Sequence, residues 1–278
     1  MTERQLARKK AIIRRRIFLG LCFAVLVLII ALVAFIIKAV VSAPEDKNPS
    51  EITSSDVSDV SLDNKVEEVE PQVNEYGLDV TFSNLLLVNG KNPLPDDYDK
   101  NVREFLVEID PQYRNNNYVT KIHKDVYPYI TAMVAKAQKD GVDLKVWSPF
   151  RSYADQKVLF ENKVKRVTDS TGLTGDAAEK EAATVVARPG TSEHNTGLCA
   201  DFNMASSKFA DTEMYKWMTE NAEDFGFIMR YREDKQPITG VIHESWHWRF
   251  VGINVAKDIN RLDMCLEEYV EYLEKNRG

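Results

Sequence analysis

The chain has 278 residues, a net charge of −7 and three cysteines. That length suits one or two domains, and a negatively charged chain with no basic cluster beyond its N-terminus argues against nucleic-acid binding. Three cysteines do not make a disulfide framework, so a small disulfide-stabilised module is excluded and the compartment stays open.

The N-terminal region predicts a membrane anchor. A cluster of Arg and Lys precedes the uncharged run Ile17–Ile37, which is long enough to cross a bilayer as a helix. The basic flank should stay in the cytoplasm. We therefore expect a cytoplasmic segment over 1–16, a single-pass anchor over 17–41, and an extracytoplasmic remainder at the cell membrane. The alternative is a signal peptide cleaved after "VVSA", which would make the protein secreted.

Residues 42–76 predict a linker, because they are rich in Asp, Glu and Ser. Such a stretch buries too little apolar surface to order itself. The remaining residues, 77–278, have the size and mixed composition of one globular domain.

Within 77–278 the patterns predict short strands mixed irregularly with helices, which indicates an α+β fold. In chain order we expect a strand over 84–90, a helix over 121–139, a strand over 144–148, a helix capped by Ser152, a helix over 175–186, a helix over 212–224, strands over 227–231 and 246–251, and a last helix from Asn254.

The last helix is expected to run unbroken, since its apolar residues fall on one stripe. They are Val255, Ile259, Leu262, Leu266, Tyr269 and Leu273. Glu267 lies beside that stripe and is interpreted as a solvated charge.

The stretch "HESWH", residues 243–247, matches H-E-x-x-H, in which two histidines one helical turn apart bind zinc. Here Pro237 and Gly240 lie just upstream, and aromatic residues then alternate with polar ones at a period of two. That pattern favours a strand entered from a loop over a zinc-binding helix. The partner of His247 should therefore come from elsewhere.

The Gly-rich segment "RPGTSEHNTGLCADF", residues 188–202, carries another candidate pair. His194, Asp201 and His247 together would give three protein ligands with one position open to water, which is the pattern of catalytic zinc. Glu244 would then be placed to take a proton from that water.

These motifs resemble the LAS zinc metallopeptidases. "SEHNTGLCAD" is similar to S-x-H-x-x-G-x-A-x-D and "ESWHWRFVG" to E-x-W-H, and the segments "LLLVNGKNPLPDDY" and "VWSPFRSYADQ" are similar to VanY-type D-alanyl-D-alanine carboxypeptidases. The resemblance implies a small, mostly antiparallel sheet flanked by helices. It also implies Zn²⁺ as cofactor and the peptidoglycan stem peptide ending in D-Ala-D-Ala as substrate.

The same resemblance assigns roles to individual residues. His194, Asp201 and His247 would be metal ligands and Glu244 the general base. Arg151 would grip the substrate carboxylate or the oxyanion, and the residues at the positions of Gln156 and Ser192 would contact the peptide. The usual Tyr before that Arg is Phe150 here, so its hydroxyl contact is lost.

Several alternatives remain open. An L,D-carboxypeptidase acting on tetrapeptides shares these motifs, and a non-catalytic wall-binding module would keep the fold. His243 is interpreted as a residue of the cleft or one that orients Glu244, Cys199 as a small buried thiol, and Trp246, Trp248 and Phe250 as core. Arg249 should face the same side as His247.

Overall fold

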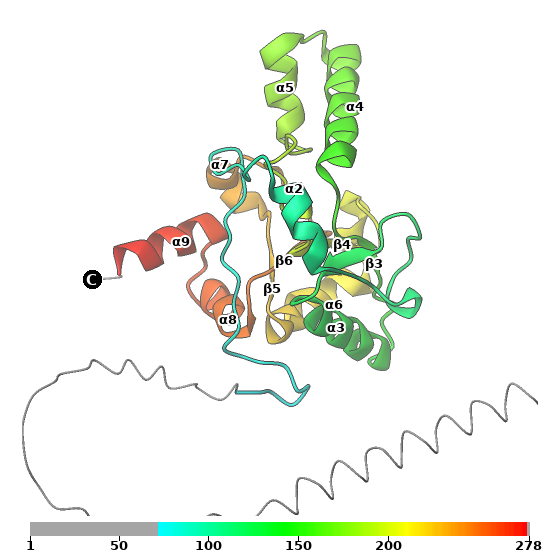
Figure 1. The fold of residues 1–278 in the computed structure, drawn as a ribbon, viewed down its shortest axis with the longest axis vertical. Helices are drawn as coiled ribbons and strands as arrows, with labels where there is room; N and C mark the ends of the chain where they lie inside the picture. Colours follow the sequence, from blue (N-terminus) through cyan, green and yellow to red (C-terminus); the bar gives the residue numbers. More distant parts are fainter. Residues whose placement is uncertain (1–71, 277–278) are drawn as a thin grey trace, which may run out of the picture. The chain divides into compact units, whose positions relative to one another are not determined.

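The computed structural model describes residues 72–276 (Figure 1). The predicted cytoplasmic segment, the anchor over 17–41 and most of the linker lie outside the described residues. Within the described part, no helix has both the length and the apolar character needed to cross a membrane.

The described residues form an α+β fold, as predicted. The helices are α2 (Tyr98–Asn101), α3 (Tyr127–Lys139), α4 (Tyr153–Thr171), α5 (Gly175–Ala183), α6 (Glu213–Asn221), α7 (Gln236–Thr239), α8 (Ile253–Arg261) and α9 (Leu266–Lys275). The strands are β1 (Leu106–Glu108), β2 (Lys121–His123), β3 (Val146–Ser148), β4 (Cys199–Phe202), β5 (Phe227–Met229) and β6 (His247–Phe250). Short 3₁₀ turns join them, of which η3 (Glu193–Asn195) matters most for the site.

The central sheet has four strands in the order β3–β4–β6–β5, and every neighbouring pair is antiparallel. The register places Asp201 of β4 opposite His247 of β6 and also opposite Ser148 of β3. β1 and β2 form a separate antiparallel pair. The sheet therefore brings together segments that are about fifty residues apart in the sequence.

The two faces of the sheet differ because side chains alternate along a strand. Ala200, Phe202, Trp248 and Phe250 point into the main hydrophobic core, where they pack with residues of α3 and α6. The intervening positions of β4 and β6 carry Cys199, Asp201, His247 and Arg249, all buried. One face thus supplies the core and the other carries polar groups.

Helices α4 and α5 form a hairpin that projects from the rest of the fold (Figure 1). Ser152 caps α4 by accepting a hydrogen bond from the Asp155 N–H at 3.1 Å, as predicted. The hairpin has its own small apolar cluster, made of Phe160, Val167, Ala178 and Ala182. This cluster is separate from the main core.

Three expected elements differ in the structure. Residues 84–90 form no strand, because the Asn84 and Leu86 carbonyls accept hydrogen bonds from the Arg249 side chain and not from a strand ladder. The helix expected over 121–139 begins at Tyr127, after strand β2.

The last helix is broken into α8 and α9, contrary to the sequence interpretation. Asp263 has a positive φ of 55°, which ends α8. Cys265 then caps α9, and its N–H donates to the Glu268 carboxylate at 2.8 Å. The apolar stripe continues on both helices, so the periodicity was correct although the helix is not continuous.

Candidate active site and metal centre

The HESWH stretch is a loop and a turn that lead into strand β6, as the alternation predicted. The Tyr231 carbonyl holds the loop by accepting from the Glu244 N–H at 3.0 Å, and it lies 2.9 Å from His243 Nδ1. The stretch is not helical, so the alternative of a helical H-E-x-x-H zinc site is wrong. His243 thus precedes Glu244 in the sequence and lies at hydrogen-bonding distance from the Tyr231 backbone.

His194 is placed by the turn η3 that precedes β4. Gly197 ends this turn with φ of 70°, a left-handed conformation that side chains rarely adopt. A Cβ at Gly197 would also lie 2.9 Å from the His123 backbone nitrogen. The motif glycine is thus required both by its conformation and by the close approach of β2.

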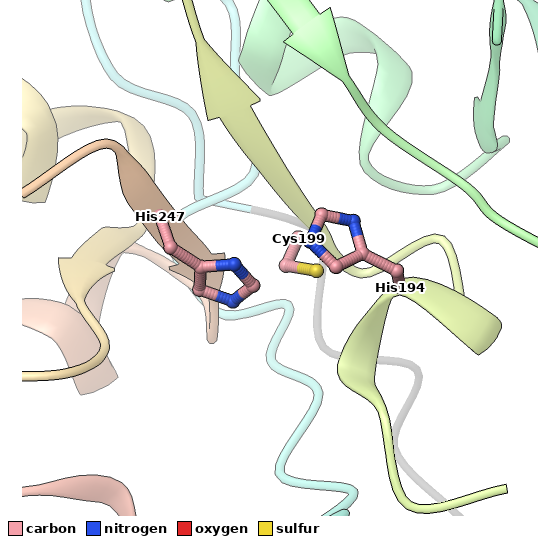
Figure 2. A group of neighbouring side chains, drawn as sticks. All are labelled: His194, Cys199 and His247. Carbon is pink, nitrogen blue, oxygen red and sulfur yellow. The ribbon is translucent and has the colours of Figure 1, made fainter. Parts of the chain in front are cut away.

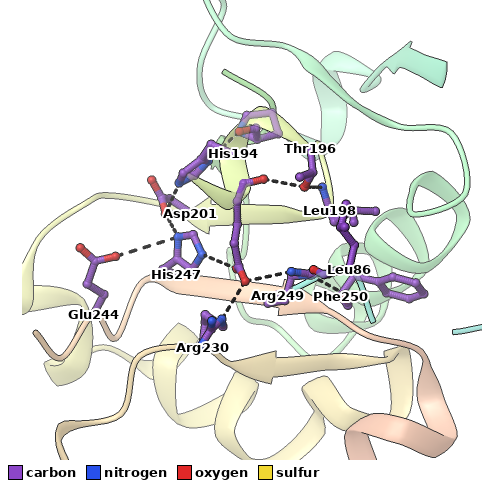
Figure 3. A network of polar contacts seen from close by, with 12 residues as sticks. Leu86, His194, Thr196, Leu198, Asp201, Arg230, Glu244, His247, Arg249 and Phe250 are labelled. Carbon is purple, nitrogen blue, oxygen red and sulfur yellow. Dashed lines mark hydrogen bonds and ion pairs between the residues drawn. The ribbon is translucent and has the colours of Figure 1, made fainter. Parts of the chain in front are cut away.

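The three predicted metal ligands converge (Figure 3). Asp201 Oδ1 lies 3.4 Å from His194 Nε2 and 3.1 Å from His247 Nδ1. The two imidazole rings meet edge to face, with centroids 4.9 Å apart. Two imidazole nitrogens and one carboxylate oxygen form the donor set of a catalytic zinc site, which keeps a further position open.

The second nitrogen of each imidazole also has a partner. His194 Nδ1 lies 2.7 Å from the Pro149 carbonyl, and His247 Nε2 lies 3.4 Å from Glu193 Oε2. An N–H on these atoms leaves the nitrogens that face Asp201 with free lone pairs. Such outer partners set the tautomer of a metal-binding histidine, so the residues fit a zinc ion.

The electrostatics of the cluster favour a bound positive charge. Burial would lower the pKa of His194, but the charges of Cys199 and Asp201 outweigh burial and raise it to about 9. Burial raises the pKa of Glu244 to about 7, against the nearby His247. The same anionic surroundings favour a bound cation, since metal binding replaces protons on its ligands.

A pocket of about 240 Å³ opens over the three residues. Glu244 lines it, with Oε2 4.0 Å from His247 Nδ1. Arg151 lines it too and is the one Arg or Lys among the described lining residues. Ser192 lies buried in the same wall.

Arg151 is held from two sides. Its guanidinium donates to Gln156 Oε1 at 2.8 Å and to Ser148 Oγ at 3.0 Å. The Gln156 amide in turn donates to the Ala187 carbonyl at 2.7 Å. Of the aromatic residues expected in the core, Trp248 and Phe250 are buried there, whereas the partly buried Trp246 also lines the pocket.

Sequence reasoning missed a buried ion network behind His247 (Figure 3). Glu193 accepts from Arg230 at 2.7 Å and from Arg249 at 2.8 Å, and all three are almost fully buried. Arg230 also donates two hydrogen bonds to Glu267, at 2.6 and 2.9 Å. The interpretation of Glu267 as a solvated charge is therefore wrong, because it neutralises a buried guanidinium.

One signal for this network was present in the sequence. Glu193 sits inside the motif, next to His194, where a bare carboxylate would be costly to bury. Arg249 faces the same side as His247, as expected, and reaches that histidine through Glu193.

Comparisons with known proteins place this chain in a family. The family model for VanY, D-alanyl-D-alanine carboxypeptidase, matches residues 119–253. A D-alanyl-D-alanine carboxypeptidase of Enterococcus faecalis is 40% identical over 186 residues, which are 67% of this chain and 65% of that relative. The match thus spans slightly less than two thirds of that relative's length.

Solved structures give the same result. A mutant of the vancomycin-resistance D,D-pentapeptidase VanY in complex with Zn(II) is 39% identical, with a TM-score of 0.55, covering 67% of this chain and 98% of that one. VanYB in complex with D-alanine-D-alanine is 40% identical, with a TM-score of 0.56 and coverages of 67% and 97%. The LdcB LD-carboxypeptidase is 33% identical, with a TM-score of 0.58 and coverages of 73% and 93%. With nearly the whole of each solved domain matched, this chain belongs to the VanY family of D-alanyl-D-alanine carboxypeptidases.

Proposed function

We propose that the protein is a zinc-dependent D,D-carboxypeptidase that removes the C-terminal D-alanine from peptidoglycan stem peptides. The observation that carries this proposal is the placement of Glu244 beside the donor set of His194, Asp201 and His247 in one pocket, with Arg151 in the same wall. A module that only binds the cell wall has no need of a buried carboxylate at that position.

In this proposal Glu244 is the general base. Its carboxylate removes a proton from water as the water attacks the carbonyl that precedes the last residue, and it then returns the proton to the departing amine. Its burial makes it a stronger base than an exposed carboxylate. Zn²⁺ held by His194, Asp201 and His247 would supply Lewis-acid activation of the water and the carbonyl.

Arg151 selects a substrate with a free C-terminus. A guanidinium can grip a carboxylate with two parallel hydrogen bonds or stabilise the developing oxyanion. Gln156 uses both ends of its amide on Arg151 and Ala187, so we propose that it fixes Arg151 in place. Ser192, which lines the same pocket, is the second residue that we propose for a contact with the peptide.

The test is cleavage of defined peptides by the full-length protein loaded with zinc. A stem pentapeptide and a stem tetrapeptide are incubated separately, with and without a chelator, and the products are weighed by mass spectrometry. Chelator-sensitive loss of one alanine from the pentapeptide alone is the expected result. No cleavage of either peptide by protein that holds zinc would refute the proposal.

A second candidate is an L,D-carboxypeptidase, which the likeness to the LdcB LD-carboxypeptidase favours. The proposed donor set and general base serve both reactions, since both hydrolyse the peptide bond before a C-terminal alanine. Loss of one alanine from the tetrapeptide alone would assign the protein to that activity and leave the proposed roles of the site residues intact.

We also propose that residues 17–41 anchor the protein in the cell membrane with residues 77–278 outside. The uncharged run and its basic flank support this orientation, and the substrate lies on that side of the membrane. Protease added to intact cells from which the wall has been removed should digest the domain. Protection of the domain until the cells are lysed would contradict the proposed orientation.

A further inference from the structure

Cys199 departs from the motif in which it lies. The family pattern S-x-H-x-x-G-x-A-x-D has Ala where this chain has Cys199, two residues before Asp201. Residues two apart on a strand point to the same face, so the thiol shares the face of β4 that carries Asp201. It is completely buried.

The thiol lies between the two histidines (Figure 2). One ring nitrogen of His194, one ring nitrogen of His247 and Cys199 Sγ all lie within 4.8 Å of one another. Sulfur and imidazole nitrogen bind zinc at about 2.3 and 2.0 Å, so donors on one ion are separated by roughly 3 to 4 Å. A small side-chain adjustment brings the three donors onto one ion.

The direction of approach distinguishes Cys199 from the other donors. His194, Asp201 and His247 line the pocket, whereas Cys199 does not. The sulfur therefore does not face the pocket, and the pocket side of the cluster stays free for water and substrate. A thiolate that binds from outside the pocket adds a bond without blocking the reaction.

We propose that Cys199 Sγ is a further protein ligand of the metal, and that it binds the ion beside His194 and His247. This inference rests on the metal site of the proposed function. On binding, the thiol releases its proton to solvent and the sulfur forms a bond to the ion. A thiolate is a softer donor than a carboxylate, so it shifts the preference of the site toward Zn²⁺ and Cd²⁺ and away from Mg²⁺ and Mn²⁺.

The test replaces the metal of the full-length protein with Co²⁺ and records its absorption spectrum. A sulfur-to-cobalt charge-transfer band in the near ultraviolet is expected. Cys199→Ser should lose that band, keep the visible cobalt bands and bind zinc roughly 10- to 100-fold more weakly, the range that even an outer partner of a ligand is worth.

The matched control is Cys265→Ser. Cys265 is also buried, and it caps α9 with its side chain, a role that a serine hydroxyl can keep. This variant should retain the charge-transfer band. X-ray absorption at the zinc edge of the unmodified protein needs no variant and should show one sulfur at about 2.3 Å.

The outcomes separate this inference from the proposed function. Visible cobalt bands that His194→Ala abolishes, with no sulfur band and no sulfur at the zinc edge, would overturn the thiolate ligand and leave the metal site standing. Failure of the protein to bind either cobalt or zinc would overturn the metal site itself, and the thiolate ligand with it.

Discussion

The floor of the pocket and its outer wall are built differently. The floor residues Asp201 and His247 lie on paired strands of the central sheet, and each is buried and hydrogen-bonded. The wall residues Leu159 and Val185 are apolar and come from the α4–α5 hairpin and the segment after it. Bond-making chemistry needs atoms held within fractions of an ångström, whereas contact with a side chain tolerates more freedom. The central sheet therefore supplies the rigid floor, and the α4–α5 hairpin supplies a wall that can tolerate some movement.

Removing the general base should have the largest effect on the rate of the reaction. We expect Glu244→Gln to reduce kcat by about 10²- to 10⁴-fold, since a glutamine cannot accept the proton. Steady-state cleavage of the stem pentapeptide measures kcat, and metal analysis should show unchanged zinc content. Loss of zinc in this variant would mean that Glu244 holds the metal and is not merely beside it.

Removing charge from the buried ion network tests how much the stability of the protein depends on the groups behind His247. Glu193→Gln leaves two buried guanidinium groups with one carboxylate, Glu267, which should destabilise the protein by about 3 kcal/mol or more. Urea unfolding followed by fluorescence measures this change. Glu161→Gln on exposed α4 is the matched control and should be nearly neutral.

The pH dependence of stability should report on Glu267. Burial would raise the pKa of Glu267, but the Arg230 guanidinium outweighs burial and holds it below the ordinary value. A lowered pKa in the folded state stabilises the protein above the unfolded pKa of about 4.3, and this stabilisation disappears as the pH falls through the folded pKa.

The unfolding free energy of the unmodified protein should therefore exceed that of Glu267→Gln near neutral pH, and the two should converge in acid. Urea titrations at a series of pH values give the comparison. A difference that stays constant from roughly pH 7 to pH 3 would show that the ionisation of Glu267 does not contribute.

The smallest effect is expected at the wall. Leu159→Ala removes apolar contact from the pocket, so KM should rise by about tenfold or less while kcat stays nearly the same. Steady-state kinetics separates the two constants. A fall in kcat as large as the rise in KM would mean that the wall also positions the scissile bond, and the contrast between floor and wall would fail.

The sequence predicted the residues of the pocket floor better than the buried ion network behind them. The period of two around Trp246 and Trp248 identified β6, and local patterns identified most helices, because these signals lie within a few neighbouring residues. Convergence of His194, Asp201 and His247 was inferred from two motifs. The motif drew attention to Glu193, but its pairing with Arg230, 37 residues away, has no local signature, since no nearby pattern identifies the partner.

Two further differences have local causes that a pattern does not reveal. The apolar stripe from Val255 to Leu273 crosses the break at Asp263 unchanged, so periodicity alone could not locate the end of α8. Residues 84–90 have the composition of a strand but bond to the Arg249 side chain. A tertiary contact decided that conformation.

The separate cluster of the α4–α5 hairpin has a consequence for how the molecule opens. Phe160, Val167, Ala178 and Ala182 pack among themselves, so we expect the hairpin to open as a unit of its own, at a smaller free energy than the sheet. In native-state hydrogen exchange its amides should exchange by a local opening that leaves β4 and β6 protected. The rim of the pocket would then open transiently and admit a stem peptide that is still attached to the cell-wall polymer. The strands β4 and β6 would stay folded meanwhile.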